Sequence, residues 1–423
     1  MAKYELNMKE RITIENFGGL KQISIPLNSI NIFIGKQASG KSITAKLVYF
    51  FKGIFNDIFN GVIDNKTKTE IDKLILNKFE DYFPSEGWST GTFSITYEIG
   101  SQSITLERQI NTKNKLKIQY SEAIKNAFSG CRKLIKKNEE QEEDKISFRS
   151  YNIFLREKYY SYLIKELGKV ATFNQIFIPA GRSFFANLQS SIFSFLSNNK
   201  AIDPFLVEFG SFYSNVKSIV ERPDRLEKRN IPKEHIDTLI LEILGGRYTR
   251  DKNKDYIIQP DNRKIDVSFS SSGQQETLPL SIILKALTLI GFSGEGATIY
   301  IEEPEAHLFP SAQKKMVELI ATVYNNSRNQ LQFIITTHSP YILTSINNLL
   351  NAGLLKEQGV NERKLYKIVP KHEIITPREV NAFAMKDGKA LNLIDSETGL
   401  ISADLLDQVS EEISIQFDEL LDL

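Results

Sequence analysis

One segment constrains the fold of this chain more than any other: Gly35-Lys36-Gln37-Ala38-Ser39-Gly40-Lys41-Ser42. It matches the pattern G-x-x-x-x-G-K-[ST] at every fixed position, and it lies between an apolar run at 29–34 and an apolar-faced helix that opens at Ile43. This order of strand, glycine loop and helix lets backbone N–H groups and a helix N-terminus surround phosphate oxygens. A glycine-rich surface turn is the alternative, and it would not require the flanking strand and helix. We therefore predict that residues 35–43 bind a nucleotide, with Lys41 at the β- and γ-phosphates and the Ser42 hydroxyl on a magnesium ion.

Length, charge and cysteine content restrict the class of protein. The 423 residues suffice for two or three domains, or for one large α/β unit with insertions. A net charge of +1 gives no overall attraction to nucleic acid or membrane. The single cysteine, Cys131, excludes an internal disulfide framework and a cysteine-based zinc site. Because we find no signal core and no run of about 18 apolar residues, we expect a cytoplasmic protein.

Alternating apolar and polar residues predict strands on both sides of the glycine loop. The runs 11–17 and 20–27 flank Gly18-Gly19, and the runs 92–99 and 102–108 flank a second turn. Both pairs are typical of β-hairpins, and residues 116–120 continue the alternation. We therefore expect an antiparallel N-terminal sheet.

Helical spacing dominates three other stretches. They are residues 44–82, a charged region at about 121–170 and a region at about 190–245. The last region contains a basic cluster at 221–229, which is either an exposed turn between helices or a contact for DNA or a partner.

Adjacent carboxylates end an apolar run at 297–301. Nucleotide hydrolysis needs an acidic residue at a strand end to hold magnesium and gains from a second carboxylate that orients or deprotonates water. Glu302 suits the first role and Glu303 the second. Taken alone, two glutamates after a strand are also typical of a solvated strand end.

A histidine ends the next apolar run, at 332–337. His338 can bond a γ-phosphate, and it follows the acidic strand in the expected order. The other histidines, His235, His307 and His372, are scattered along the sequence and suggest no common site.

Upstream of both runs, a serine-rich stretch opens a helix through Leu287. Its residues Ser272, Gly273 and Gln274 either form an anion site at the helix N-terminus or follow an ordinary serine N-cap.

In their order and spacing these motifs resemble the ABC-type ATPase heads of the RecF, SMC and OLD branch. Residues 34–42 resemble the Walker A loop, with Lys36-Gln37 where the family usually has Pro-Asn. Residues 299–308 are similar to a Walker B strand in which Glu302 replaces the commoner Asp, and residues 336–340 resemble the switch-histidine segment. Residues 271–275 resemble the signature motif, and residues 178–182, which end in Arg182, occupy the place of the Q-loop strand.

The resemblance implies an ATP- and magnesium-dependent ATPase whose site is shared by two subunits. Lys41, Ser42, Glu302, Glu303 and His338 would come from one chain, and Ser272, Gly273 and Gln274 from the other. It implies an α/β head with a mixed core sheet, an antiparallel N-terminal sheet and a helical lobe.

The same resemblance leaves two functions open. Because neither a Toprim nor an H-N-H nuclease pattern follows His338, residues 1–423 resemble a single stand-alone head with helical insertions. Such heads resemble the ATPase subunits of anti-phage modules of the PARIS and Septu types, where a separately encoded nuclease is the partner and DNA or a phage protein the trigger. The alternative is a RecF-like ATPase that binds DNA in repair or recombination.

Overall fold

The computed structural model describes nearly all of the sequence stretches considered above. The described residues are 9–109, 116–139, 148–186, 203–220, 232–252, 254–289, 296–327, 330–402 and 415–420. The basic cluster at 221–229 and parts of both helical insertions lie outside them. Within these ranges, no helix is both long and apolar enough to cross a membrane.

The N-terminal half forms a five-stranded antiparallel sheet in the order β2-β1-β4-β5-β6. Its strands are β1 (Glu10–Phe17), β2 (Leu20–Leu27), β4 (Phe93–Ile99), β5 (Gln102–Arg108) and β6 (Leu116–Tyr120). The two predicted hairpins and the strand at 116–120 are therefore confirmed. Four helices pack with this sheet: α1 (Lys41–Ile63), α2 (Lys68–Tyr82), α3 (Glu122–Glu139) and α4 (Phe148–Leu167).

The central layer is a six-stranded mixed sheet in the order β14-β13-β3-β12-β11-β7. It consists of β3 (Ile30–Ile34), β7 (Asn174–Ile178), β11 (Ala297–Glu302), β12 (Leu331–Thr337), β13 (Val380–Lys386) and β14 (Lys389–Asn392). Except for β14, neighbouring strands are parallel, so their carboxyl ends meet at one edge. The glycine loop, Glu303 and His338 follow three adjacent strands at that edge.

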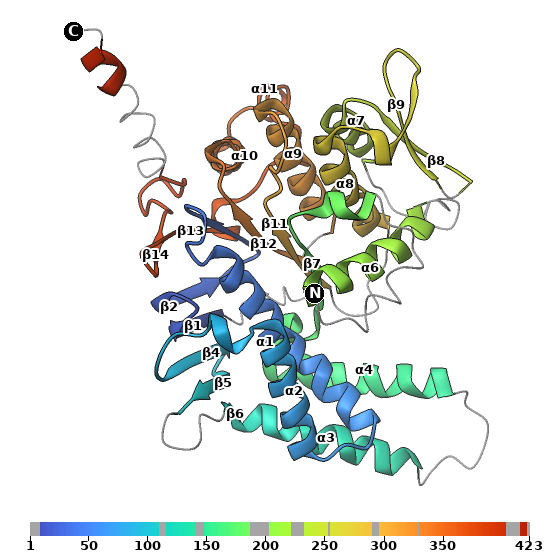
Figure 1. The fold of residues 1–423 in the computed structure, drawn as a ribbon, viewed down its shortest axis with the longest axis vertical. Helices are drawn as coiled ribbons and strands as arrows, with labels where there is room; N and C mark the ends of the chain where they lie inside the picture. Colours follow the sequence, from blue (N-terminus) through green and yellow to red (C-terminus); the bar gives the residue numbers. More distant parts are fainter. Residues whose placement is uncertain are drawn as a thin grey trace.

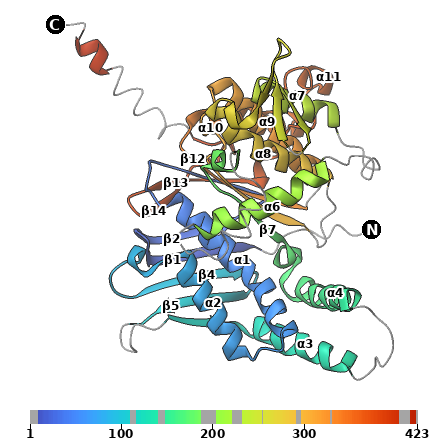
Figure 2. The ribbon, with the colours of Figure 1, turned by 45° about the vertical axis from the view of Figure 1, so that its right-hand side comes forward.

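Both faces of the central sheet are covered, which explains why its strands are continuous apolar runs. Phe33, Tyr300 and Ile334 face the core that includes α1 and the antiparallel sheet, while Ile299 and Ile335 face the second core. The second core is completed by α6 (Pro204–Val220), α7 (Lys233–Leu244), α8 (Ser272–Leu289), α9 (Pro310–Ser327) and α10 (Pro340–Glu357). Figures 1 and 2 show these helices on one side of the central sheet and the antiparallel sheet with α1–α4 on the other.

Three of the described strands were not anticipated from the sequence. Two of them, β13 and β14, are joined by the turn Asp387-Gly388, and β13 is a central strand beside β3. The other, β8 (Arg247–Asp251), joins β9 (Lys254–Ile258) and β10 (Lys264–Asp266) in a small antiparallel sheet. A short helix, α11 (Glu362–Leu365), follows α10, and residues 415–420 are also helical. The expected fold class is confirmed: α/β, with a mixed core sheet, an N-terminal antiparallel sheet and helices on the far face.

Candidate nucleotide-binding site

The glycine loop is held tightly between neighbouring backbone segments. A Cβ on Gly35 would lie 2.4 Å from the Met385 carbonyl oxygen of β13. Gly40 has a φ of 95°, and a Cβ there would lie 2.4 Å from Leu20 in β2. Ala38 also adopts a left-handed backbone, with a φ of 58°. The two glycines are therefore required by close approach as well as by the loop's curvature.

Lys41 begins α1, and its ammonium group bends back over the loop. Its Nζ donates to the carbonyl oxygens of Gly35 (2.8 Å) and Lys36 (2.9 Å). It also lies 3.4 Å from Nδ1 of His338. Burial lowers the pKa of Lys41, although the nearby carboxylates of Glu303 and Glu305 act in the opposite direction. The ammonium group is thus poised at the rim of the loop, where phosphate oxygens would replace the carbonyls.

Two consecutive glutamates at the end of β11 face different surroundings. Glu302 is 7% exposed, and its Oε2 accepts a hydrogen bond from the Ala180 N–H (3.3 Å), while Oε1 is buried without a partner. Glu303 has a left-handed backbone, with a φ of 44°, and its N–H donates to the Thr336 carbonyl oxygen (2.9 Å). That backbone turn sends adjacent carboxylates to different positions, in keeping with the separate roles expected for them.

His338 lies between the second glutamate and the lysine. Its Nε2 is 3.2 Å from Oε1 of Glu303, and its Nδ1 is on the Lys41 side. The backbone N–H of His338 donates to Oε1 of Glu305 (2.6 Å), which also accepts from the Thr337 hydroxyl (2.7 Å). Three sequence-predicted residues, Lys41, Glu303 and His338, are therefore brought into one connected group.

Arg182 lies behind this group and does not face outward. Its side chain is fully buried, and its guanidinium donates to the backbone carbonyl oxygens of Glu302 (2.7 Å) and Glu303 (3.0 Å). Its Nε donates to the Glu276 carbonyl oxygen (3.1 Å) and lies 3.3 Å from that residue's Oε1. Arg182 is thus a positioning residue for the acidic strand end, since it binds the backbone of the two glutamates.

The predicted signature residues start helix α8 on a separate surface. Ser271 and Gln274 cap each other: the Ser271 hydroxyl accepts from the Gln274 N–H (3.3 Å), and Oε1 of Gln274 accepts from the Ser271 N–H (3.2 Å). A Cβ on Gly273 would lie 2.8 Å from the His307 carbonyl oxygen, in the loop that follows the acidic strand. Ser272 follows Ser271 at the first position of α8. The start of α8 therefore has the serine N-cap that the alternative interpretation of this stretch predicts.

The carboxylates suit a magnesium ion. Oε1 of Glu302 and Oε2 of Glu305 are buried oxygens without hydrogen-bond partners, and Mg2+ takes oxygen ligands. The residues predicted to hold the ion lie at the same sheet edge: Ser42 follows the loop after β3, and Glu302 ends β11, with β12 between these two strands. The Ser42 side chain is exposed.

Two functional candidates were missed from the sequence. Glu305 was part of the quoted motif but received no role, and Glu276 was not singled out as a partner of Arg182. A strand-end glutamate three residues after Glu302 offers a weak sequence signal. The Arg182–Glu276 contact joins residues 94 positions apart, which spacing alone does not reveal.

Comparison with known proteins finds two curated relatives that are named as probable ATPases. The chain is 23% identical over 157 residues to a retron Vc95 probable ATPase of Vibrio cholerae serotype O1 biovar El Tor, covering 36% of this chain and 30% of that protein. It is 32% identical over 109 residues to a retron Ec83 probable ATPase of Escherichia coli, covering 24% and 19%. The chain therefore matches less than a third of the length of each relative.

Among solved structures, an SMC head bound to the C-terminal winged-helix domain of ScpA aligns with a TM-score of 0.41 and 12% identity, over 91% of this chain and 97% of that one. The SMC head domain from Thermotoga maritima aligns with a TM-score of 0.36 and 12% identity, over 91% and 98%.

The family assignment rests on the sequence profile of the AAA ATPase domain. This profile matches residues 8–205 and 169–343, which together include the glycine loop, the acidic strand and His338. The expected resemblance to an ABC-type ATPase of the RecF/SMC-like branch is confirmed by this match together with the fold and the retron relatives. The chain belongs to the AAA ATPase domain family.

Proposed function

We propose that this protein binds and hydrolyses ATP with magnesium at the carboxyl edge of its central sheet, and that its nucleotide state acts as a switch. The observation that carries the proposal is the connected group of Lys41, His338 and Glu303, with separations of 3.4 Å and 3.2 Å. Hydrolysis of the γ-phosphate uses a cation at the phosphates, a hydrogen-bond partner for the γ-phosphate and a carboxylate at the attacking water, and these three groups lie together here.

Each residue has a distinct role in this proposal. The backbone N–H groups of residues 35–43 surround the phosphates, and Lys41 exchanges its loop carbonyls for β- and γ-phosphate oxygens. Ser42 and Glu302 would hold Mg2+, which neutralises charge on the phosphates when bound. Glu303 accepts the proton of the attacking water, and His338 bonds the γ-phosphate.

We further propose that a second copy of the chain completes the site. Ser272, Gly273 and Gln274 start an 18-residue helix, whose N-terminus favours an anion. Two exposed aromatic residues belong to the segments that meet here: Phe269 (85% exposed) precedes the helix, and Phe309 (77% exposed) is in the loop whose His307 carbonyl oxygen Gly273 approaches. Large exposed apolar side chains are typical of contact surfaces. ATP would then join two heads, and hydrolysis would release them.

The biological role we propose is in defence against phage. Two relatives are retron probable ATPases, which favours a switch that senses infection and controls a separately encoded effector such as a nuclease. The alternative, a RecF-like repair ATPase, receives less support from a net charge of +1. Both cores lie on the same central sheet, which supports one ATPase head with helical insertions.

The test separates nucleotide binding from hydrolysis. We expect Lys41→Ala to weaken ATP binding strongly, because it removes the cation at the loop. Glu303→Gln should bind ATP like the wild type but lower kcat about 100-fold or more, since it removes only the proton acceptor. The measurements are equilibrium ATP binding and steady-state phosphate release. Wild-type turnover by Glu303→Gln would contradict the role of Glu303, and normal ATP binding by Lys41→Ala would contradict the assignment of the loop.

A further inference from the structure

A second group of ionisable side chains lies away from the nucleotide site. We call His235, His372 and Glu373 the His-Glu cluster. His235 belongs to α7, while the other two residues precede β13 by several positions. The sequence suggested that the histidines are scattered, and this expectation is wrong for two of them: the rings of His235 and His372 have their centroids 4.1 Å apart.

The three side chains converge on one point. Nε2 of His235 lies 2.8 Å from Oε1 of Glu373. Each residue offers one ligand atom, and these three atoms all lie within 4.8 Å of one another. Nε2 of His372 is buried and has no hydrogen-bond partner. A buried polar atom without a partner is uncommon in a folded protein, and a ligand at this point would satisfy it.

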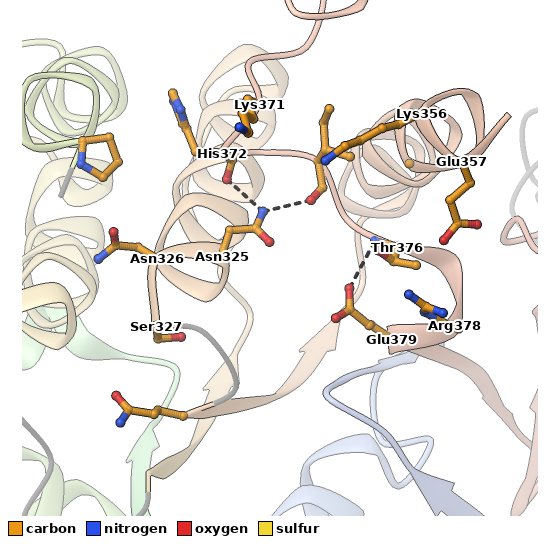
Figure 3. Close-up of a pocket in the computed structure, with 14 residues that line it drawn as sticks. Asn325, Asn326, Ser327, Lys356, Glu357, Lys371, His372, Thr376, Arg378 and Glu379 are labelled. Atoms are coloured by element: carbon orange, nitrogen blue, oxygen red, sulfur yellow. Dashed lines mark hydrogen bonds between the residues drawn. The ribbon is translucent and has the colours of Figure 1, made fainter. Parts of the chain in front are cut away.

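The segment that carries His372 and Glu373 is firmly held. Nδ2 of Asn325, in α9, donates to the carbonyl oxygens of His372 (2.8 Å) and Ile374 (2.9 Å), one on each side of Glu373 (Figure 3). Gly353 of α10 approaches closely enough that a Cβ there would lie 2.1 Å from the Ile375 carbonyl oxygen. The cluster is therefore built on a fixed backbone, as a metal site requires.

Charged side chains from α7 and α9 surround the cluster. Two further carboxylates, Glu242 and Glu318, lie close enough to influence His235, and they are paired with Lys315 at 3.0 Å and 3.1 Å. Lys314 also pairs with Glu318, at 3.4 Å. The two lysines thus pair with Glu242 and Glu318, while the Glu373 carboxylate pairs with His235 inside the cluster.

The protonation states also suit metal binding. Burial lowers the pKa of both His235 and His372, so that each imidazole keeps a lone pair for a metal. Burial raises the pKa of Glu373 to about 7, and a bound cation would displace that proton.

We propose that the His-Glu cluster binds one divalent transition-metal ion of the zinc class. Two imidazole nitrogens and one carboxylate are a ligand set that Zn2+ uses with water in the fourth position. Magnesium and calcium prefer sites made of oxygen ligands alone, so the His-Glu cluster does not suit the Mg2+ ion proposed for the nucleotide site. His372 also lines a cavity of about 1140 Å3 bordered by Lys371, Asn325 and Arg378, through which the ion and its water would have access (Figure 3).

A bound ion would connect two segments that are distant in sequence. It would tie α7 to the segment that leads into β13, the strand beside the glycine-loop strand. Because both segments already meet at the cluster, binding requires only small adjustments of the three side chains. We therefore expect the metal to raise the thermal unfolding temperature of the whole protein.

The test uses metal-stripped, full-length protein titrated with ZnCl2 and, separately, with CoCl2. We expect one equivalent of zinc per chain by elemental analysis and a visible cobalt spectrum typical of nitrogen ligation. His372→Gln and Glu373→Gln should each weaken zinc binding about 100-fold or more, since each removes a ligand. The matched control is His338→Gln, which changes a histidine of the nucleotide site and should leave the zinc stoichiometry and the cobalt spectrum unchanged.

The outcomes separate the proposal from its competitors. Circular dichroism identifies any variant that fails to fold, and the wild-type cobalt spectrum remains informative without a variant. Absence of stoichiometric zinc binding by the wild type would overturn the proposal. Undiminished zinc binding by a folded His372→Gln protein, or loss of zinc in His338→Gln alone, would also overturn it.

Discussion

The two ends of strand β12 differ in whether the buried polar groups around them have hydrogen-bond partners. At its amino end, Gln332 belongs to a closed polar network: its Nε2 donates to Oε2 of Glu10 (2.8 Å), and its Oε1 accepts from Lys52 (2.8 Å) and from the Thr298 hydroxyl (3.0 Å). Lys52 and Glu10, each 3% exposed, form an ion pair, and the Tyr97 hydroxyl donates to Glu10. This network connects α1 with both large sheets, because Glu10 lies in the antiparallel sheet and Gln332 lies in the central sheet.

At the carboxyl end of the same strand, several polar atoms are left without partners. Thr336 Oγ1, Glu302 Oε1 and Glu305 Oε2 are buried and unpaired, while His338 is exposed. Unpaired buried oxygens cost stability, and they persist where a ligand satisfies them. The difference indicates that the amino end holds the two layers together and that the carboxyl end is arranged for a ligand.

The largest expected effect comes from opening the closed network. Lys52→Met leaves the Glu10 carboxylate buried without its ion partner, so we expect the free energy of unfolding to fall by about 3–5 kcal/mol. Lys46→Met is the matched control on the same helix. The Lys46–Asp203 pair (2.9 Å) is partly exposed, and we expect a loss of at most about 1 kcal/mol.

Urea unfolding followed by circular dichroism measures both changes. Equal losses for Lys52→Met and Lys46→Met would contradict the claim that the buried network at the amino end of β12 holds the two layers together. In a double variant, Glu10→Leu with Lys52→Met, the stability loss should be smaller than in Lys52→Met alone, because no unpaired charge remains.

A smaller effect is expected from the support of the acidic strand end. Arg182→Lys keeps the charge but loses the forked contacts to the carbonyl oxygens of Glu302 and Glu303. We expect kcat to fall about 10- to 100-fold while the affinity for ATP changes less than about threefold, because the glutamates shift and the glycine loop does not. Steady-state kinetics measures the change in kcat, and equilibrium ATP binding measures the change in affinity. A proportional loss of affinity and kcat would show that Arg182 acts through general stability instead.

The sequence revealed much of the fold because its local patterns are strong. The glycine loop between an apolar strand and a helix, and the hairpins around Gly18-Gly19 and Gly100-Ser101, are set by neighbouring residues. By contrast, β13 was missed because it pairs with β3, a strand far away in the sequence, where Met385 restricts Gly35 to glycine.

The residues of the two candidate sites fall into the same two groups: some are predictable from local sequence patterns, and others depend on long-range packing. Lys41, Glu302, Glu303 and His338 follow strands, so their convergence was predictable from a parallel sheet. The contacts of Arg182 with Glu276, and the pairing of His235 with His372, depend on long-range packing. The spacing of residues along the sequence does not predict such long-range contacts.

The central claim is that two chains share each ATP site, and a measurement on purified mixed dimers tests it most directly. Two differently tagged chains are co-expressed, one with Lys41→Ala and the other with Ser272→Arg, and the mixed dimers are isolated through both tags. If the signature acts across the interface, one of the two sites is complete, and turnover should be about half that of the wild type.

The control places both substitutions on one chain and pairs it with a wild-type chain. Shared sites would then both be damaged, and we expect almost no turnover. If each site instead lay within one chain, the results would be reversed: the first mixed dimer would be inactive and the second would keep about half the activity. That reversal, or failure to recover any mixed dimer in the presence of ATP, would contradict the account.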